Sequence, residues 1–137
     1  MEVFGGMNYL YFETQHNYGG NAIVIPIDIK TPKGAFPSSA RIDTGAYMSC
    51  FDKAVARQLG INDLTTGTPV GATAANGNHA QGYAFPVTVA LLGKSIIIPV
   101  AFVPDWDEGT PNLLGMDGFL DRFGAIAIDH RVRQFYY

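Results

Sequence analysis

The sequence predicts an all-β domain, and three observations support this class. Gly 16 and Pro 8 are frequent while charged residues make up only 15% of the chain, a balance typical of proteins built from strands and turns. Several segments alternate apolar and polar side chains with the period of a half-buried strand. Turn-forming dipeptides separate these segments. With 137 residues, the chain has the length of one domain that needs no disulfide or structural metal.

The first strands are expected in the N-terminal third. Residues 7–13 and 22–30 have strand-like sequences, and the second segment has isoleucine at every other position. Pro26 lacks a backbone N–H, so this strand is expected at a sheet edge or with a bulge. Residues 31–34 form a turn signal, and residues 35–42 form a further strand. Residues 1–21 are expected to be an N-terminal extension or to add a strand.

One amphipathic helix is expected over residues 52–59, where apolar residues recur at helical spacing. Its N-cap is either Ser49 or Asp52, because both side chains can accept hydrogen bonds from the first free N–H groups of a helix. Gly60 ends the helix.

The C-terminal half predicts hairpins. Small residues dominate 68–85, and Asn76-Gly77 is a strong turn dipeptide, so this segment is expected to be a hairpin. The other expected elements are a second hairpin of 86–92 with 95–103, an acidic loop over 104–111, a short helical stretch that ends at Arg122, and closing strands over 125–129 and 132–136.

Composition excludes several function classes. The net charge is -3 and the only basic cluster is 130–133, so no nucleic-acid surface is expected. The acidic loop 104–111 lacks the ligand spacing of a calcium loop, and no histidine or cysteine supports it, so no metal and no other cofactor is expected.

The number of cysteines and the hydropathy pattern indicate the expected cellular location. Cys50 is the only cysteine, so no internal disulfide forms and the thiol is expected to be a small buried apolar group. No segment has the ~20 apolar residues of a membrane helix, and no signal peptide is visible. We therefore expect a cytoplasmic protein with no membrane partner.

The loop after 35–42 reads Asp43-Thr44-Gly45-Ala46. Asp and Thr side chains bond nearby backbone N–H groups and Gly tolerates positive φ, so these residues make a good turn. A carboxylate just past the end of a strand can also be a catalytic group. The four residues alone leave both interpretations open.

Three motifs occur in an order that resembles a known family. They are Asp43-Thr44-Gly45-Ala46, the glycine-rich hairpin some thirty residues later, and Leu113-Leu114-Gly115-Met116-Asp117 followed by Phe119-Leu120-Asp121-Arg122-Phe123. Over roughly residues 23–135 the chain resembles the retropepsin-like aspartic proteases, in particular their bacterial and cellular members. The resemblance implies a closed β-barrel with one or two short helices, a single protease domain over 1–137, and aspartic endopeptidase activity on a peptide or protein substrate.

The chemistry of such a site needs two carboxylates. Hydrolysis by activated water requires one group that accepts a proton and one that donates a proton. Two carboxylates about 3 Å apart share one proton and supply both roles, as aspartic proteases illustrate. Only one Asp-Thr-Gly occurs in the chain. The second catalytic Asp43 must therefore come from a second copy in a two-fold homodimer.

The resemblance also implies supporting roles. Thr44 would bond across the interface, Gly45 would let the backbone pass close to the substrate, and Ala46 would keep the pocket floor small. The residues expected in a flap that closes over the substrate are Ala75, Asn76, Gly77, Asn78 and His79. The residues expected to support the Asp43 loop are Leu113, Leu114, Gly115 and Asp117, with Asp117 either at the N-terminus of the short helix or bonded to the loop backbone. His79 is expected to be a polar flap residue.

The sequence departs from the viral members at two positions. Tyr47 and Met116 stand where those members usually carry an acidic residue and an arginine that brace the dimer, which puts dimer strength in question. Residues 135–137 could pair at the interface, cover the barrel or continue into a further region.

Other functions stay open beside endopeptidase activity. The chain could be a retropepsin-like module that dimerises or binds peptides without cleaving them, or an interaction domain of a larger chain. For an active enzyme, Ala46, Met48, Cys50 and the hairpin are expected to form pocket walls that favour apolar substrate side chains.

Overall fold

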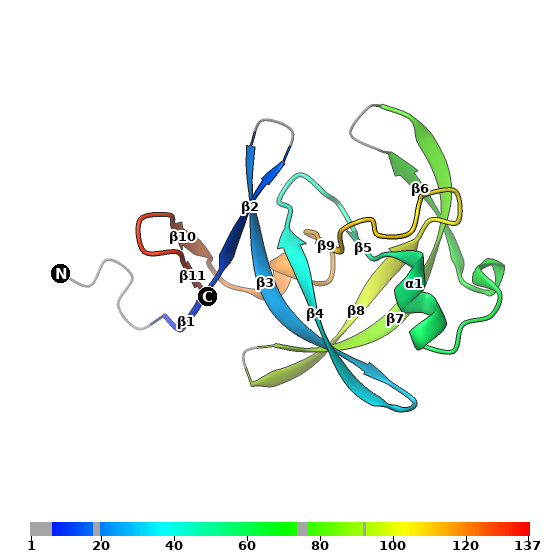
Figure 1. Cartoon of the computed structure of the whole chain (residues 1–137), viewed down its shortest axis with the longest axis horizontal. Helices are drawn as coiled ribbons and strands as arrows, with labels where there is room; N and C mark the ends of the chain where they lie inside the picture. The colour runs from blue at the N-terminus through cyan, green and yellow to red at the C-terminus, as the bar shows by residue number, and fades with distance from the viewer. Residues whose placement is uncertain (1–6, 18–19, 74–76, 92) are drawn as a thin grey trace.

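A closed β-barrel forms the body of the molecule (Figure 1). The computed structural model describes residues 7–17, 20–73, 77–91 and 93–137. The strands of the ring, in spatial order, are β3 (Gly20–Thr31), β4 (Gly34–Ile42), β9 (Leu113–Leu114), β5 (Ser49–Cys50), β8 (Lys94–Phe102) and β7 (His79–Leu91). Pairing of β3 with β7 through Asp28↔Ala90 and Ile29↔Val89 closes the ring. The predicted all-β barrel is confirmed.

Two further strands extend this sheet beyond the ring. β2 (Glu13–Asn17) pairs with the first part of β3, and β6 (Thr68–Thr73) pairs with the first part of β7. The β6–β7 hairpin projects past the barrel (Figure 1), and the helix α1 spans Lys53–Gln58. Two 3-10 helices, η1 (Leu64–Thr66) and η2 (Leu120–Arg122), complete the helical part of the described chain. None of the helices in the described segments is long and apolar enough to cross a membrane.

The structure decides between the two residues expected as the N-cap of α1, Ser49 and Asp52. Asp52 is the cap, because its Oδ1 accepts the N–H of Ala54 at 3.2 Å. Gly60 has φ +79 just past the helix end, a conformation that glycine adopts at little cost. Ser49 lies in β5 and has another role, described below.

Pro26 lies in an inner strand whose register with β4 is unbroken, and this corrects the expectation of a sheet edge or a bulge. It pairs with Ser39 of β4 and is exposed. On the other side of β3, pairing with β2 ends at Val24 and pairing with β7 begins at Asp28. On this side of β3, Pro26 therefore falls in the gap between β2 and β7, where its missing N–H interrupts no pairing with either strand.

A single long strand, β7, replaces two predicted ones. The sequence predicted a hairpin up to residue 85 and a new strand from Pro86, but β7 runs from His79 through Leu91. Pro86 pairs with Pro99 of β8 and is exposed. The first part of β7 therefore belongs to the β6–β7 hairpin, and the second part belongs to the barrel.

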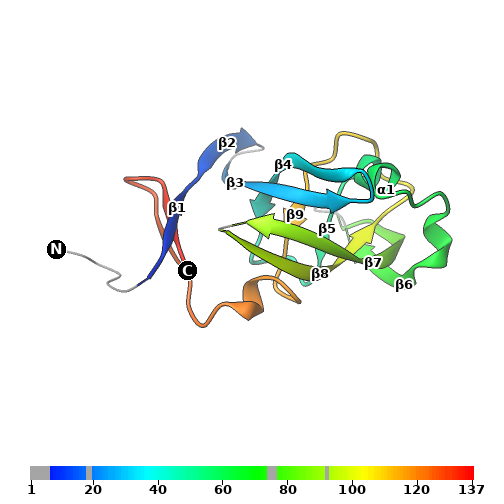
Figure 2. The ribbon, with the colours of Figure 1, turned by 90° about the horizontal axis from the view of Figure 1, so that it is seen from below.

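The two ends of the chain form a separate small sheet. β1 (Tyr9–Tyr11), β11 (Gln134–Tyr136) and β10 (Ala127–Asp129) pair in the order β1-β11-β10. The strand predicted over 7–13 is thus split, because the buried Phe12 donates its N–H to Arg133 and the chain then changes sheet. Figures 1 and 2 both place this terminal sheet at one end of the molecule. Residues 135 and 136 pair with β1 and β10 of the same chain, and the buried Phe135 joins the hydrophobic core.

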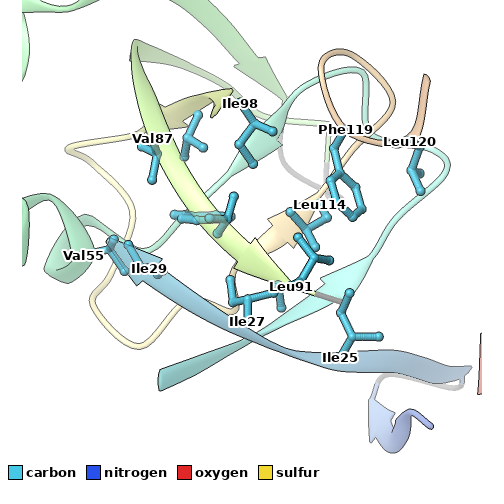
Figure 3. Packing of buried hydrophobic residues seen from close by; sticks show 14 of the residues in the cluster. Ile25, Ile27, Ile29, Val55, Val87, Leu91, Ile98, Leu114, Phe119 and Leu120 are labelled. Atoms are coloured by element: carbon cyan, nitrogen blue, oxygen red, sulfur yellow. The ribbon is translucent and has the colours of Figure 1, made fainter. Parts of the chain in front are cut away.

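The hydrophobic core fills the barrel and reaches the terminal sheet. Alternate residues of β3, namely Ile25, Ile27 and Ile29, are buried, as their spacing predicted. Figure 3 shows Leu114 and Phe119 side by side in this core. Because Leu114 belongs to β9, the strand beside the Asp43 loop is anchored directly in the core.

Candidate active site

The Asp43 loop (residues 43–48) begins where β4 ends. β4 and β9 are parallel neighbours, with Ile42 opposite Leu114. The pairing continues one residue further, since the Asp43 N–H donates to the Leu114 carbonyl oxygen at 3.0 Å. The start of the loop is therefore held at a defined place relative to the core.

A tight turn orients the Asp43 carboxylate. Its Oδ1 accepts the Gly45 N–H at 2.9 Å, and the Ala46 N–H donates to the Asp43 carbonyl at 3.2 Å. A side chain at residue 45 would lie 3.3 Å from this Oδ1, so glycine suits the close approach. Asp43 is half-buried while Thr44 and Gly45 are exposed. The turn and the catalytic interpretations are compatible, because the turn presents one carboxylate at the surface.

Gly115 packs against the far side of the loop. A Cβ on this residue would lie 2.8 Å from the carbonyl oxygens of Ala46 and Met48, so only glycine fits. Its N–H donates to Ser49 Oγ at 3.0 Å, and Ser49 is fully buried. The sequence-based assignment missed Ser49 as a support of the loop, because a serine in an apolar stretch gives no local signal of its partner.

A second buried polar group connects the neighbouring elements. The Asn112 side chain accepts the Asp52 N–H at 2.9 Å and donates to the Ser39 carbonyl at 3.1 Å. Asp52 in turn accepts the Gly109 N–H at 2.9 Å. The N-terminus of α1, strand β4 and the acidic loop are thus joined beside the site.

A cavity of about 520 Å³ adjoins the Asp43 loop, and we call it the loop cavity. Its lining residues come from the loop, from β5, β6, β8 and β9, and from the acidic loop: Gly45, Ala46, Tyr47, Met48, Cys50, Val70, Gly71, Ala72, Thr73, Ala101, Trp106 and Leu113. The lining includes the three wall residues expected from the sequence, Ala46, Met48 and Cys50. Trp106 was missed, because it lies in a loop that the sequence indicated only as solvated and acidic.

Three of the predicted flap residues, Gly77, Asn78 and His79, lie at or just before the start of β7 in the β6–β7 hairpin. Gly77, Asn78 and His79 are exposed, whereas Ala75 and Asn76 lie outside the described residues. The Nδ1 atom of His79 is 3.0 Å from Thr73 Oγ1, in a hydrogen bond across the hairpin. Among the described residues of the hairpin, those that reach the loop cavity belong to β6.

The segment after Gly115 also bonds to the Asp43 loop. The Met116 N–H donates to the Ala46 carbonyl at 2.9 Å, and the Asp117 N–H donates to the Tyr47 carbonyl at 2.6 Å. Helix η2 begins only at Leu120, and the acid in its first turn is Asp121. Asp117 thus contacts the loop through its backbone N–H, and the two roles considered for its carboxylate stay predictions.

Cys50 is half-buried in the wall of the loop cavity rather than fully buried. Burial raises the pKa of its thiol to about 11, because a thiolate is poorly solvated there. The thiol is therefore protonated at neutral pH and behaves as a small apolar wall. Within the described residues, no group of three His, Cys, Asp or Glu side chains is placed to hold a metal ion.

The barrel and its loop define a class of protein. A closed all-β barrel with Asp-Thr-Gly at the end of a strand, supported by a Leu-Leu-Gly strand, is the arrangement of single-lobe, retropepsin-like aspartic proteases. Residues 33–122 match the family described as "gag-polyprotein putative aspartyl protease". This match covers more than half of the chain, and the chain belongs to that family.

Two solved structures share the fold. One is a retropepsin-like aspartic protease from Rickettsia conorii, with a TM-score of 0.66 and 22% identity over 100% of this chain and 98% of that one. The other is the EIAV protease in complex with the inhibitor HBY-793, with a TM-score of 0.55 and 20% identity over 77% of this chain and 91% of that one. Among curated proteins, no significant match to the sequence is found.

Proposed function

We propose that the chain is an aspartic endopeptidase whose active form is a symmetric homodimer. The Asp43 carboxylates of the two copies form the catalytic pair, in which one takes a proton from water and the other donates a proton to the substrate. A two-fold axis brings the same residue to both sides of an interface. Residues 1–137 would act together as one protease domain.

The observation that carries this proposal is the placement of Asp43. Asp43 is half-buried, and its carboxylate accepts a hydrogen bond from the Gly45 N–H at 2.9 Å. Its backbone N–H donates to the Leu114 carbonyl, which fixes the residue at the end of β4. A catalytic group needs such fixed geometry, because small displacements of the reacting atoms reduce the rate strongly.

The lining of the loop cavity is evidence for a peptide substrate. It lies directly beside Gly45 and Ala46, and apolar side chains such as Met48, Val70 and Leu113 line it. Such a cavity favours an apolar side chain near the scissile bond, while an extended main chain can bond to strand edges. The β6–β7 hairpin, including Gly77, Asn78 and His79, would act as the flap, closing over the bound peptide and excluding water.

Cleavage of a peptide library by the wild type and by Asp43→Asn tests the proposal. The reaction is followed from about pH 3 to pH 8, the range in which a carboxylate pair can hold one proton. We expect cleavage beside apolar residues by the wild type and a loss of at least about a hundredfold in Asp43→Asn. Cleavage that survives the substitution would exclude the mechanism.

A second candidate function is peptide binding without cleavage. It is favoured by one observation, that each chain carries a single Asp-Thr-Gly and hence only half of the pair. Under this alternative, labelled peptides from the library bind to the wild type and to Asp43→Asn alike, and neither protein yields products. Wild-type cleavage that is lost in Asp43→Asn rules this alternative out.

A further inference from the structure

We infer that Ser49 is a positioning residue for the proposed reaction, because its buried hydroxyl holds the segment that fixes Asp43. The inference rests on the proposed function, since it concerns the same carboxylate. It goes further by making the rate of cleavage depend on a side chain that does not line the loop cavity.

The Ser49 hydroxyl lies in apolar surroundings. Ser49 is 0% exposed, and its partner in β8 is the fully buried Val100. In the described part of the chain, the buried polar residues are Ser49 and Asn112. Burial of a hydroxyl costs free energy unless it is hydrogen-bonded, and Ser49 Oγ accepts the Gly115 N–H at 3.0 Å. The buried serine is therefore bonded specifically to the support of the Asp43 loop.

Gly115 lies between two residues that bond to the Asp43 loop. On one side, the Leu114 carbonyl accepts the Asp43 N–H at 3.0 Å. On the other side, the Met116 N–H donates to the Ala46 carbonyl at 2.9 Å, and the Ala46 N–H donates to the Asp43 carbonyl at 3.2 Å. The serine hydroxyl thus holds the middle of a three-residue segment whose outer residues hold both ends of the turn that orients the carboxylate.

The hydroxyl also extends the connection between two short strands of the ring. β5 and β9 lie side by side (Figure 1), and their pairing is Cys50↔Leu113. Beyond this pair, toward the Asp43 loop, the bond from the Gly115 N–H to Ser49 Oγ continues the connection through a side chain. Without this acceptor, the buried N–H loses its partner and the segment can shift. Because the turn is bonded to that segment, the carboxylate shifts with it.

Kinetics of the full chain test the inference, at concentrations where the rate per chain no longer depends on concentration. We expect Ser49→Ala to lower kcat at least about tenfold, because small displacements of a reacting group reduce the rate strongly. The KM should stay within about twofold, since the binding surface is unchanged. Ser49→Thr keeps the hydroxyl and should restore most of the lost kcat.

Ser38→Ala is the matched control. Ser38 is another serine of the ring, whose Oγ accepts a hydrogen bond from Asn112 Nδ2 at 3.3 Å. Its removal should leave kcat and KM within about twofold of the wild type. Thermal unfolding shows whether each variant is folded.

Three results would overturn the inference. The first is a Ser49→Ala variant with the kcat of the wild type, and the second is an equal loss of kcat in Ser49→Ala and Ser38→Ala. The third is a Ser49→Ala variant that does not fold, which would assign the hydroxyl to stability alone.

Hydrogen exchange separates this inference from the proposed function, because it needs no cleavage. The Asp43 amide should exchange at least about tenfold faster in Ser49→Ala than in the wild type or in Ser38→Ala, since its acceptor segment is loosened. If this acceleration occurs and the wild type cleaves no peptide, the proposed function fails and the positioning of Asp43 by Ser49 stands. Conversely, cleavage that depends on Asp43, with kcat and exchange indifferent to Ser49, defeats only the inference.

Discussion

Gly115 shows how a single residue holds the candidate site in place. A Cβ there would lie 2.8 Å from two carbonyl oxygens of the Asp43 loop, and backbone cannot move away as a flexible side chain can. We expect Gly115→Ala to lower the free energy of unfolding by about 1–3 kcal/mol, measured by urea denaturation.

The matched control is Gly124→Ala, where the added Cβ meets nothing within 4 Å. This variant should stay within about 0.5 kcal/mol of the wild type. Equal stabilities of the two variants would mean that the loop does not pack on Gly115 as closely as described.

The Cys50 thiol, in the wall of the loop cavity, makes the stability of the protein depend on pH. Burial raises the pKa of its thiol to about 11, above the value of ~8.5 for an unfolded chain. The folded state therefore binds this proton more tightly, so the stability due to thiol burial is complete below the unfolded pKa and is lost as pH rises through the folded one. The wild type should lose stability relative to Cys50→Ala across this alkaline range. Urea denaturation of both proteins at several pH values measures the difference, and a difference independent of pH would refute the shifted pKa.

At the scale of elements, β3, β4 and β8 were predictable from the sequence, whereas the two-residue strands β5 and β9 were not. Alternating isoleucines indicated β3, and turn glycines indicated the boundaries of β4 and β8. The strands β5 and β9 have two residues each, Ser49–Cys50 and Leu113–Leu114, too few for a period-two pattern to appear. Their pairing is set by distant neighbours in the ring, and of the two only β9 lies in a motif of the family.

The N-terminus of α1 supports a prediction at this scale. Asp52 uses its two carboxylate oxygens separately, Oδ1 for the Ala54 N–H and Oδ2 for the Gly109 N–H. Asp52→Ala should lower the free energy of unfolding by about 1–2 kcal/mol, because both N–H groups lose their acceptor. Asp52→Asn keeps an oxygen that can cap the helix and should retain more of the stability. Chemical denaturation compares the three proteins, and equal losses in both variants would argue against the capping role.

At the scale of the whole molecule, the sequence predicted the loop and its support but only part of the cavity. Asp43 and Gly115 were found because their motifs are local. Trp106 was not, since it reaches the loop cavity only when the acidic loop folds toward the Asp43 loop. The terminal sheet was likewise beyond prediction, because it pairs the two ends of the chain.

The central claim is that each chain carries half of a catalytic site. It is tested most directly by adding Asp43→Asn protein to a fixed amount of wild type, at concentrations above the dimer Kd, and measuring cleavage. Mixed dimers hold a single Asp43 carboxylate, so equal amounts should reduce the activity to about one half and a large excess should abolish it. Activity that stays proportional to the wild type alone, whatever the excess of Asp43→Asn, would contradict the account.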